Sequence, residues 1–188
     1  MTTEVEWTPK ARAVLAAASE LFYERGIHAV GVEAVAERAG VTKKTLYDRF
    51  GSKERLVVEY LAGRDRDWCA HLDGRLRESG QSPHEQLAAV FEASASWARA
   101  HSSKGCSMIN AHAEISDPAH PAYAVIMGQK RRMLALFTDL AAAADVPDPG
   151  GVAEQLMLLH EGALVTDGMG VLDDAFGRAA QAAAALLG

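Results

Sequence analysis

The chain has 188 residues, 49% of them hydrophobic, and a formal net charge of −6, so it can build a substantial core but carries no overall positive charge for nucleic acid. It contains no charge-free run of about 18 apolar residues, and the first ten residues hold Glu4, Glu6 and Pro9 where a secretion signal needs positive charge and an apolar stretch. These features argue against a membrane association and predict a soluble, cytoplasmic protein.

The charge is unevenly distributed along the chain. Residues 1–55 carry nine Lys or Arg against eight Asp or Glu, whereas residues 56–188 carry ten against seventeen. Within residues 42–55 the count is five basic against two acidic side chains. A local basic patch on an otherwise acidic protein can dock one face on DNA and keep the rest away from it.

The first predicted helix covers about residues 8–25, with Pro9 in its first turn and Gly26 after its end. Ala and Leu dominate the composition, and apolar residues recur at three- and four-residue steps along the chain. Turn residues fall in a few clusters only, so we expect an all-α fold without strands.

Two short helices are predicted next, over about residues 32–39 and 43–50. Gly40 ends the first and Thr42 is a good N-cap for the second, which leaves the turn of three to four residues that a helix-turn-helix needs. Leu46 and Phe50, one turn apart, define the buried face of the second helix. Its outer face then carries Lys43, Lys44, Thr45, Tyr47 and Asp48.

A long helix is predicted over about residues 52–78. Its middle, residues 64–67, is too charged to be buried, so we expect this helix to join two domains. Five further helices are predicted over about residues 83–101, 108–115, 123–144, 152–167 and 173–187.

Short motifs fall at fixed offsets between residues 11 and 57. They are Leu21-Phe22 before Gly26, the run 35–41, the run 45–50, Ser52-Lys53-Glu54 and Leu56. This stretch resembles the DNA-binding domain of the tetracycline-repressor (TetR) family. The resemblance implies a transcriptional regulator, most simply a repressor that binds a palindromic double-stranded operator as a homodimer and is released by a small-molecule effector.

The resemblance also implies a division into two domains. A helix-turn-helix DNA-binding domain would cover residues 8–68, with the motif at 31–50, and a helical effector-binding and dimerisation domain would cover 69–188. The segment 105–111, which leads to Glu114, is similar to a recurring sixth-helix pattern in one branch of the family.

The DNA contacts follow from the same resemblance, because the third helix of such domains enters the major groove. Side chains expected at base edges are Lys43, Lys44, Thr45 and Asp48. Phosphate contacts are expected from Thr42, Tyr47 and Lys53, and Tyr47 could instead be packed. Lys53 also starts a helix capped by Ser52, where free N–H groups and the helix dipole favour an anion. Gly31 stands where many members have Ser or Thr, so we assign it no DNA contact.

The family pattern places an effector pocket among the middle helices and the dimer contact on the last two. Methionine and aromatic side chains suit an adaptable pocket, but for any single one of them a place in the core is the simpler interpretation, so they are pocket candidates only as a group. The pocket candidates are Trp68, Phe91, Trp97, Met108, His112, Met127, Met133, Phe137, Met157 and His160. The dimer candidates are Leu156, Ala163, Ala179, Ala183, Leu186 and Leu187.

Two other functions stay open at this point. An architectural protein would bind DNA without an effector. A metal- or thiol-dependent helical enzyme would draw on His112, Glu114, His120 or the pair His160-Glu161, but these residues lack the HExxH spacing and no catalytic triad can be placed. We therefore expect no enzyme, no catalytic or metal site and no cofactor.

Cys69 and Cys106 form neither a disulfide framework nor a metal knuckle, and they fit a reducing compartment. Cys106 could be redox-active, but Lys104 is its only cationic neighbour in the sequence, so a structural thiol is the simpler interpretation.

Overall fold

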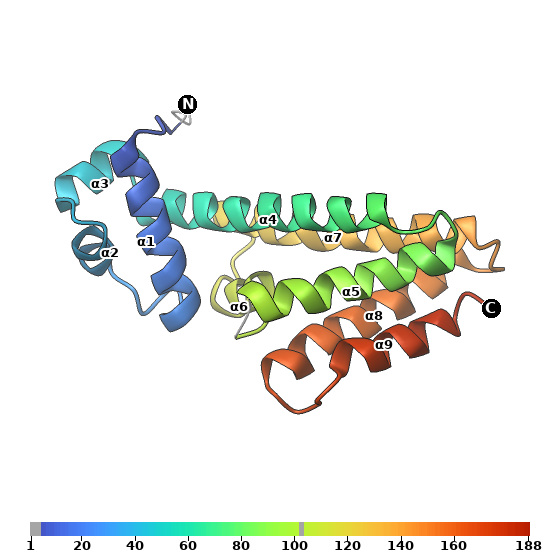
Figure 1. Ribbon diagram of the computed structural model, residues 1–188. Coiled ribbons are helices and arrows are strands. Elements are labelled where there is room, and N and C mark those ends of the chain that lie inside the picture. The colour runs from blue at the N-terminus through green and yellow to red at the C-terminus, as the bar shows by residue number, and fades with distance from the viewer. Residues whose placement is uncertain (1–4, 102–103) are drawn as a thin grey trace. The chain divides into compact units, whose positions relative to one another are not determined.

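The computed structural model describes residues 5–101 and 104–188, so Glu4 of the N-terminal stretch lies outside the described residues. The described part contains nine helices and no strand, which confirms the all-α prediction (Figure 1). The helices are α1 Pro9–Arg25, α2 Val32–Arg38, α3 Lys43–Phe50, α4 Lys53–Glu78, α5 Pro83–His101, α6 Ser107–Glu114, α7 Pro121–Ala143, α8 Pro149–Gly168 and α9 Ala175–Ala184. None of the described helices is long and apolar enough to cross a membrane.

The observed helix ends lie within three residues of the predicted ones. One of the largest differences is at the start of α8, which begins at Pro149 and not at Val152. The Asp148 side chain accepts a hydrogen bond from the Gly151 N–H at 3.0 Å, so the acid caps the helix and the proline occupies its first turn. A stretch rich in proline and glycine, residues 147–151, therefore contains the start of a helix.

The helices form two compact units. The first holds the described residues up to 64 together with 107–126, and the second holds 65–106 and 127–188, apart from the undescribed pair. Helix α4 passes from one unit to the other between Arg64 and Asp65, inside the charged stretch predicted to join two domains. Two features differ from the expected domains 8–68 and 69–188. The crossing in α4 lies a few residues before residue 68, and α6 and the start of α7 group with the N-terminal helices.

The core of the first unit is built where α1, α2 and α3 contact one another. Leu46 and Phe50, the predicted inner face of α3, are buried, as are Phe22 of α1 and Val35 of α2. Trp7, which precedes α1, packs edge-on against Phe50 with ring centres 6.4 Å apart. Since α3 buries this apolar stripe, its polar side chains lie on the opposite, outer face.

The second unit has its own apolar core, in which α5, α8 and α9 contact one another. Phe91 of α5, Phe137 of α7 and Leu156 of α8 are among its fully buried side chains. The second unit therefore has a hydrophobic core of its own, separate from that of the first unit.

Candidate DNA-binding site

The start of α3 is fixed by Thr42. The Thr42 hydroxyl accepts a hydrogen bond from the Thr45 N–H at 3.1 Å, and the two threonine hydroxyl oxygens lie 3.0 Å apart. The N-cap predicted from the sequence is thus present and satisfies one of the free N–H groups of the helix. Both threonines belong to the predicted DNA-contact set, and they lie together at the first turn.

Lys43 joins α3 to α2 through an ion pair with Glu33. The hydrogen bond from Lys43 lowers the pKa of the Glu33 carboxyl, and the reverse contact raises the pKa of the Lys43 ammonium. Both side chains are at least half exposed, so the pair is screened by solvent and adds little stability. Glu33 was missed in the sequence because nothing in its spacing indicates a partner ten residues away.

Lys44 and Asp48 form an ion pair one turn apart on the outer face of α3, with a nitrogen–oxygen distance of 2.9 Å. The Lys44 side chain is 84% exposed, and Tyr47 on the same helix is 43% exposed. Such an exposed i,i+4 pair contributes about 0.3–0.5 kcal/mol, so Lys44 can leave Asp48 at small cost when a stronger acceptor is offered.

Lys53 lies in the first turn of α4, and Ser52 caps that helix by accepting the Arg55 N–H at 3.1 Å. The Lys53 ammonium lies 5.9 Å from the centre of the Phe22 ring, within the range of a cation–π contact. Phe22 was not among the predicted neighbours, because the contact joins α1 to α4 across the fold.

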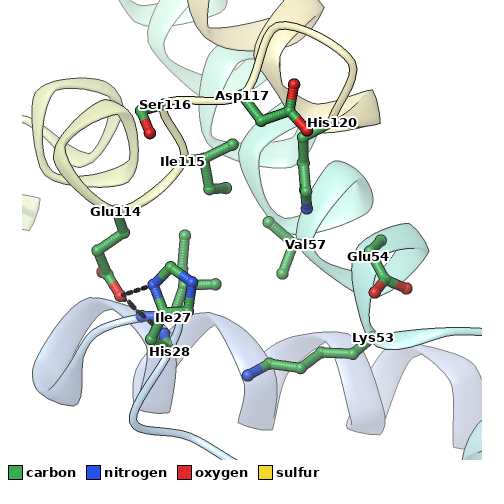
Figure 2. A pocket seen from close by; sticks show the side chains of 10 residues that line it. All are labelled: Ile27, His28, Lys53, Glu54, Val57, Glu114, Ile115, Ser116, Asp117 and His120. Carbon is green, nitrogen blue, oxygen red and sulfur yellow. Dashed lines mark hydrogen bonds and ion pairs between the residues drawn. The ribbon is translucent and has the colours of Figure 1, made fainter.

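A pocket of about 340 Å³ opens next to Lys53, lined from three parts of the first unit (Figure 2). Its apolar lining includes Ile27, Val57 and Ile115, and its polar lining includes Glu114, whose carboxylate reaches the backbone of the turn after α1. In the sequence, Glu114 stood out as the residue to which the family-like segment 105–111 leads and as a possible metal ligand, and nothing there indicated a contact with this turn. Among the described residues, no three His, Cys, Asp or Glu side chains are grouped so as to hold a metal ion.

The ten predicted effector-pocket residues are divided between the two units. Met108 and His112 belong to the first unit, where Met108 is buried and His112 is exposed on α6. In the second unit, Trp97, Met127 and Met157 are partly buried, and the buried members are Trp68, Phe91, Met133, Phe137 and His160. A separate pocket of about 320 Å³ in the second unit, lined by Arg75, Arg99 and Phe176 among others, includes Phe91 from this set.

His160 brings polar groups into the core of the second unit. Its Nε2 lies 2.8 Å from the Ser94 hydroxyl oxygen, and its ring packs edge-on against Phe91 and Phe137. Burial lowers the pKa of His160, so its neutral form is favoured. Its Nδ1 faces Glu161, and although burial alone would raise the Glu161 pKa, contacts with His160 and Lys130 lower it.

Cys106 has a basic neighbour that the sequence did not reveal. The Lys130 ammonium lies 3.7 Å from the Cys106 sulfur and 2.7 Å from a Glu161 carboxylate oxygen. Lys104 was the only cation near Cys106 in the sequence, whereas tertiary packing adds Lys130 from α7. The Lys130 ammonium also pairs with the Glu161 carboxylate, so its charge does not act on the Cys106 thiol alone.

Four of the predicted dimer residues lie on α8 and α9, and Leu186 and Leu187 follow the end of α9. Ala183 is 0% exposed and Leu156, Ala163, Ala179 and Leu187 are also buried, while Leu186 is partly buried against the same core. They pack within the protomer, which corrects the expectation that they face a second copy. Large apolar side chains exposed on and after α8 are instead Leu158, Val165, Met169, Val171 and Leu172.

The chain was compared with known proteins. Residues 14–60 match the profile of a family described as "Bacterial regulatory proteins, tetR family". The structure is similar to that of SCO4454, a TetR-family transcriptional regulator from Streptomyces coelicolor, with a TM-score of 0.86 and 30% identity over 95% of this chain and 94% of that one.

Two curated relatives are similar mainly in one part of the chain. The transcriptional activator FasR of Mycolicibacterium smegmatis is 33% identical over 105 residues, which is 56% of this chain and 47% of FasR. The transcriptional repressor KstR2 of Mycobacterium tuberculosis is 37% identical over 81 residues, which is 43% of this chain and 40% of KstR2. The chain thus spans about half the length of these relatives, or less.

Proposed function

Because the chain belongs to the TetR family of transcriptional regulators, we propose that it binds a palindromic operator in the cytoplasm as a homodimer and leaves it when a small-molecule effector occupies the second unit. The observation that carries the proposal is the outer face of α3, where a threonine-capped helix presents Lys44 and Tyr47 to solvent. Helix α3 would read base edges in the major groove, with Thr42 and Lys53 on flanking phosphates.

The named relatives include an activator and a repressor. We propose repression for this chain, because occupying an operator is sufficient to block transcription, whereas activation needs a further contact with the transcription machinery. The net charge of −6 fits either role, since the basic residues gather at 42–55 and the acidic remainder is repelled by DNA.

The homodimer is proposed on the exposed face of α8. Leu158, Gly162, Val165 and Met169 follow one another at intervals of four, three and four residues, so they lie along one face. Leu158 and Met169 are 73% and 71% exposed, and a side chain added at Gly162 would meet nothing within 4 Å. A second copy is the expected occupant, because a palindromic operator needs a two-fold protein and such an apolar face can cover itself.

Selection from a random double-stranded DNA library tests the operator proposal. The full chain should enrich an inverted repeat whose half-sites are about one helical turn or more apart. The variant Lys44→Glu should lose this enrichment, and Arg77→Glu, which removes an exposed cation in the second unit, should keep it. Enrichment of no common sequence by the full chain would contradict the proposal.

Addition of candidate metabolites to the selected complex tests the effector. An effector should bind the chain and lower operator affinity, and by linkage the operator must weaken effector binding by the same factor. Operator binding that no bound metabolite changes would favour the architectural alternative.

The switch is proposed to run through α4, which belongs to both units. It has no proline within Lys53–Glu78, so it can move as one rod and change the spacing of the two α3 helices in the dimer. A preference of about 1–3 kcal/mol for the released state changes operator affinity about 5–150-fold. Spin labels on the two copies of Arg49 should change separation on effector addition. An unchanged separation with loss of operator binding would exclude this movement.

A further inference from the structure

We infer that Glu114 is a positioning residue of the helix-turn-helix, which holds the turn between α1 and α2 in its operator-binding form. The inference rests on the proposed operator binding and gives α6 a part in it. The turn is defined here as residues 26–31, between the end of α1 and the start of α2.

The contact joins residues far apart in the sequence. Glu114, the last residue of α6, accepts the Ile27 N–H on Oε1 at 2.9 Å and the His28 N–H on Oε2 at 2.7 Å. The His28 ring nitrogen Nδ1 lies 3.3 Å from the same Oε2 (Figure 2). One carboxylate therefore faces three nitrogen atoms of the turn, and charge-assisted hydrogen bonds of this kind are stronger than neutral ones.

The backbone conformation of the turn leaves space for the Glu114 carboxylate. Gly26 has a φ of 89°, a conformation that side chains rarely adopt, and a Cβ there would lie 3.2 Å from the Glu114 Oε1. Residues 27–29 form a turn, and successive backbone N–H groups in a turn can form a concave anion-binding surface. Glycine at residue 26 thus gives the turn its backbone conformation and leaves room for the carboxylate.

The stability of α6 does not explain the acid. A carboxylate in the last turn of a helix meets the negative end of the helix dipole, where a cation is preferred. Glu114 therefore occupies an unfavourable place in its own helix and a favourable one against the turn. Because Glu114 is unfavourable for its own helix, we attribute its role to the contact with the turn and not to the stability of α6.

A series of contacts leads from Glu114 to α3, the helix proposed to enter the major groove. The turn leads into α2, and Glu33 in the first turn of α2 pairs with Lys43 at the start of α3. At its other end, α6 continues from Cys106 of the second unit. The chain thus also passes from the second unit into the first at the start of α6, and Glu114, at the other end of α6, contacts the turn through hydrogen bonds.

The test compares Glu114→Ala and Glu114→Gln with the matched control Asp117→Asn in the full chain. Asp117 lines the same pocket, but its carboxylate accepts the Ala119 N–H at 2.8 Å. Amide hydrogen exchange at Ile27 and His28 should be about tenfold faster in Glu114→Ala, less so in Glu114→Gln, and unchanged in the control. Affinity for the selected operator should fall at least about fivefold in Glu114→Ala, less in Glu114→Gln, and not in the control.

A linkage measurement separates positioning from simple stabilisation. If the contact favours operator binding, operator must slow exchange at the Ile27 and His28 amides in the wild type, and this slowing must disappear in Glu114→Ala. Faster exchange with unchanged operator affinity, or an equal loss of affinity in Asp117→Asn, would overturn the inference. If the wild type selects no operator, the proposed function fails instead, and the exchange rates still report whether Glu114 holds the turn.

Discussion

Lys44 and Lys53 are predicted to contact DNA in different ways, and their surroundings differ. Lys44 lies on the outer face of α3 and pairs with Asp48 on its own helix. Lys53 lies at the start of α4, where the helix dipole favours an anion, and its ammonium lies over the Phe22 ring. The first can reach base edges, and the second suits a phosphate at a fixed position.

We therefore expect different losses from the two alanine variants. Lys53→Ala should weaken binding similarly on all DNA sequences. It should also lower the slope of log affinity against log salt concentration by about one, as expected for the loss of one phosphate contact. Lys44→Ala should cost about 1–3 kcal/mol on the selected operator and relax the base preference at one position. Binding titrations at several salt concentrations, with operator and single-base variants, measure both effects. Identical base preferences in the two variants would contradict this division of roles.

His160 should make folding stability depend on pH. Burial holds its pKa below the ordinary value near 6.5, so the unfolded chain takes up a proton that the folded chain excludes. The free energy of unfolding should therefore fall as the pH drops below about 6.5, by at most about 1.4 kcal/mol per pH unit from this residue. Denaturant titrations between pH 7.5 and pH 5 check this in the wild type.

The variant His160→Gln should show a shallower pH dependence over the same range. His84→Gln is the matched control, since His84 is exposed and its Nε2 contacts the Gly188 carbonyl. The control should keep the wild-type dependence. A wild-type slope retained in His160→Gln would show that another group is responsible.

At the scale of single elements, two helices of the first unit begin with a threonine N-cap. Thr8 caps α1 by accepting the Ala11 N–H at 3.2 Å, and Thr42 caps α3 by accepting the Thr45 N–H at 3.1 Å. The two threonines differ in their predicted task, because only Thr42 is expected to contact DNA. This similarity provides an internal control for the recognition helix.

Thr42→Ala and Thr8→Ala should each lower the free energy of unfolding by about 0.5–2 kcal/mol through loss of the cap. Operator affinity should fall much more in Thr42→Ala, because α3 also loses its predicted phosphate contact. Denaturant unfolding and operator titration of both variants provide the comparison. Equal operator affinities at equal stability would remove Thr42 from the contact set.

At the scale of the whole molecule, we propose that folding and assembly use different faces of α8. The inner face of α8 carries Leu156 and Ala163 into the core of the second unit, and its outer face leaves Leu158 and Val165 exposed. A charge on the inner face should therefore disturb the fold, and a charge on the outer face should disturb the proposed dimer.

We expect the double variant Leu158→Glu/Val165→Glu to be monomeric, to unfold at nearly the wild-type temperature and to bind operator weakly. Ala183→Glu is the contrasting variant, since a charge in place of a fully buried alanine has no room and no partner. It should be destabilised by several kcal/mol. Light scattering and thermal unfolding distinguish the two, and a dimeric outer-face variant would remove α8 from the interface.

The helices could be predicted from the sequence because their signals are local. Apolar residues at three- and four-residue steps, Pro9 at a helix start and Gly26 after a helix end depend on the residues that neighbour them in the chain. The same holds for the caps and for the outer face of α3. The family resemblance likewise rests on a contiguous stretch, and the comparison with known proteins confirmed it.

The partners of individual side chains were decided by tertiary structure. Glu114 contacts a turn 86 residues away, and Lys130 of α7 reaches Cys106, which precedes α6. No local pattern reports such a contact, because its energy depends on which helices pack together. The dimer candidates show the same limit, because Ala179 and Ala183 were expected to face a second copy, yet the protomer buries both in its own core. Periodicity identifies the apolar face of a helix, but packing determines whether that face lies in the core of one chain or meets another.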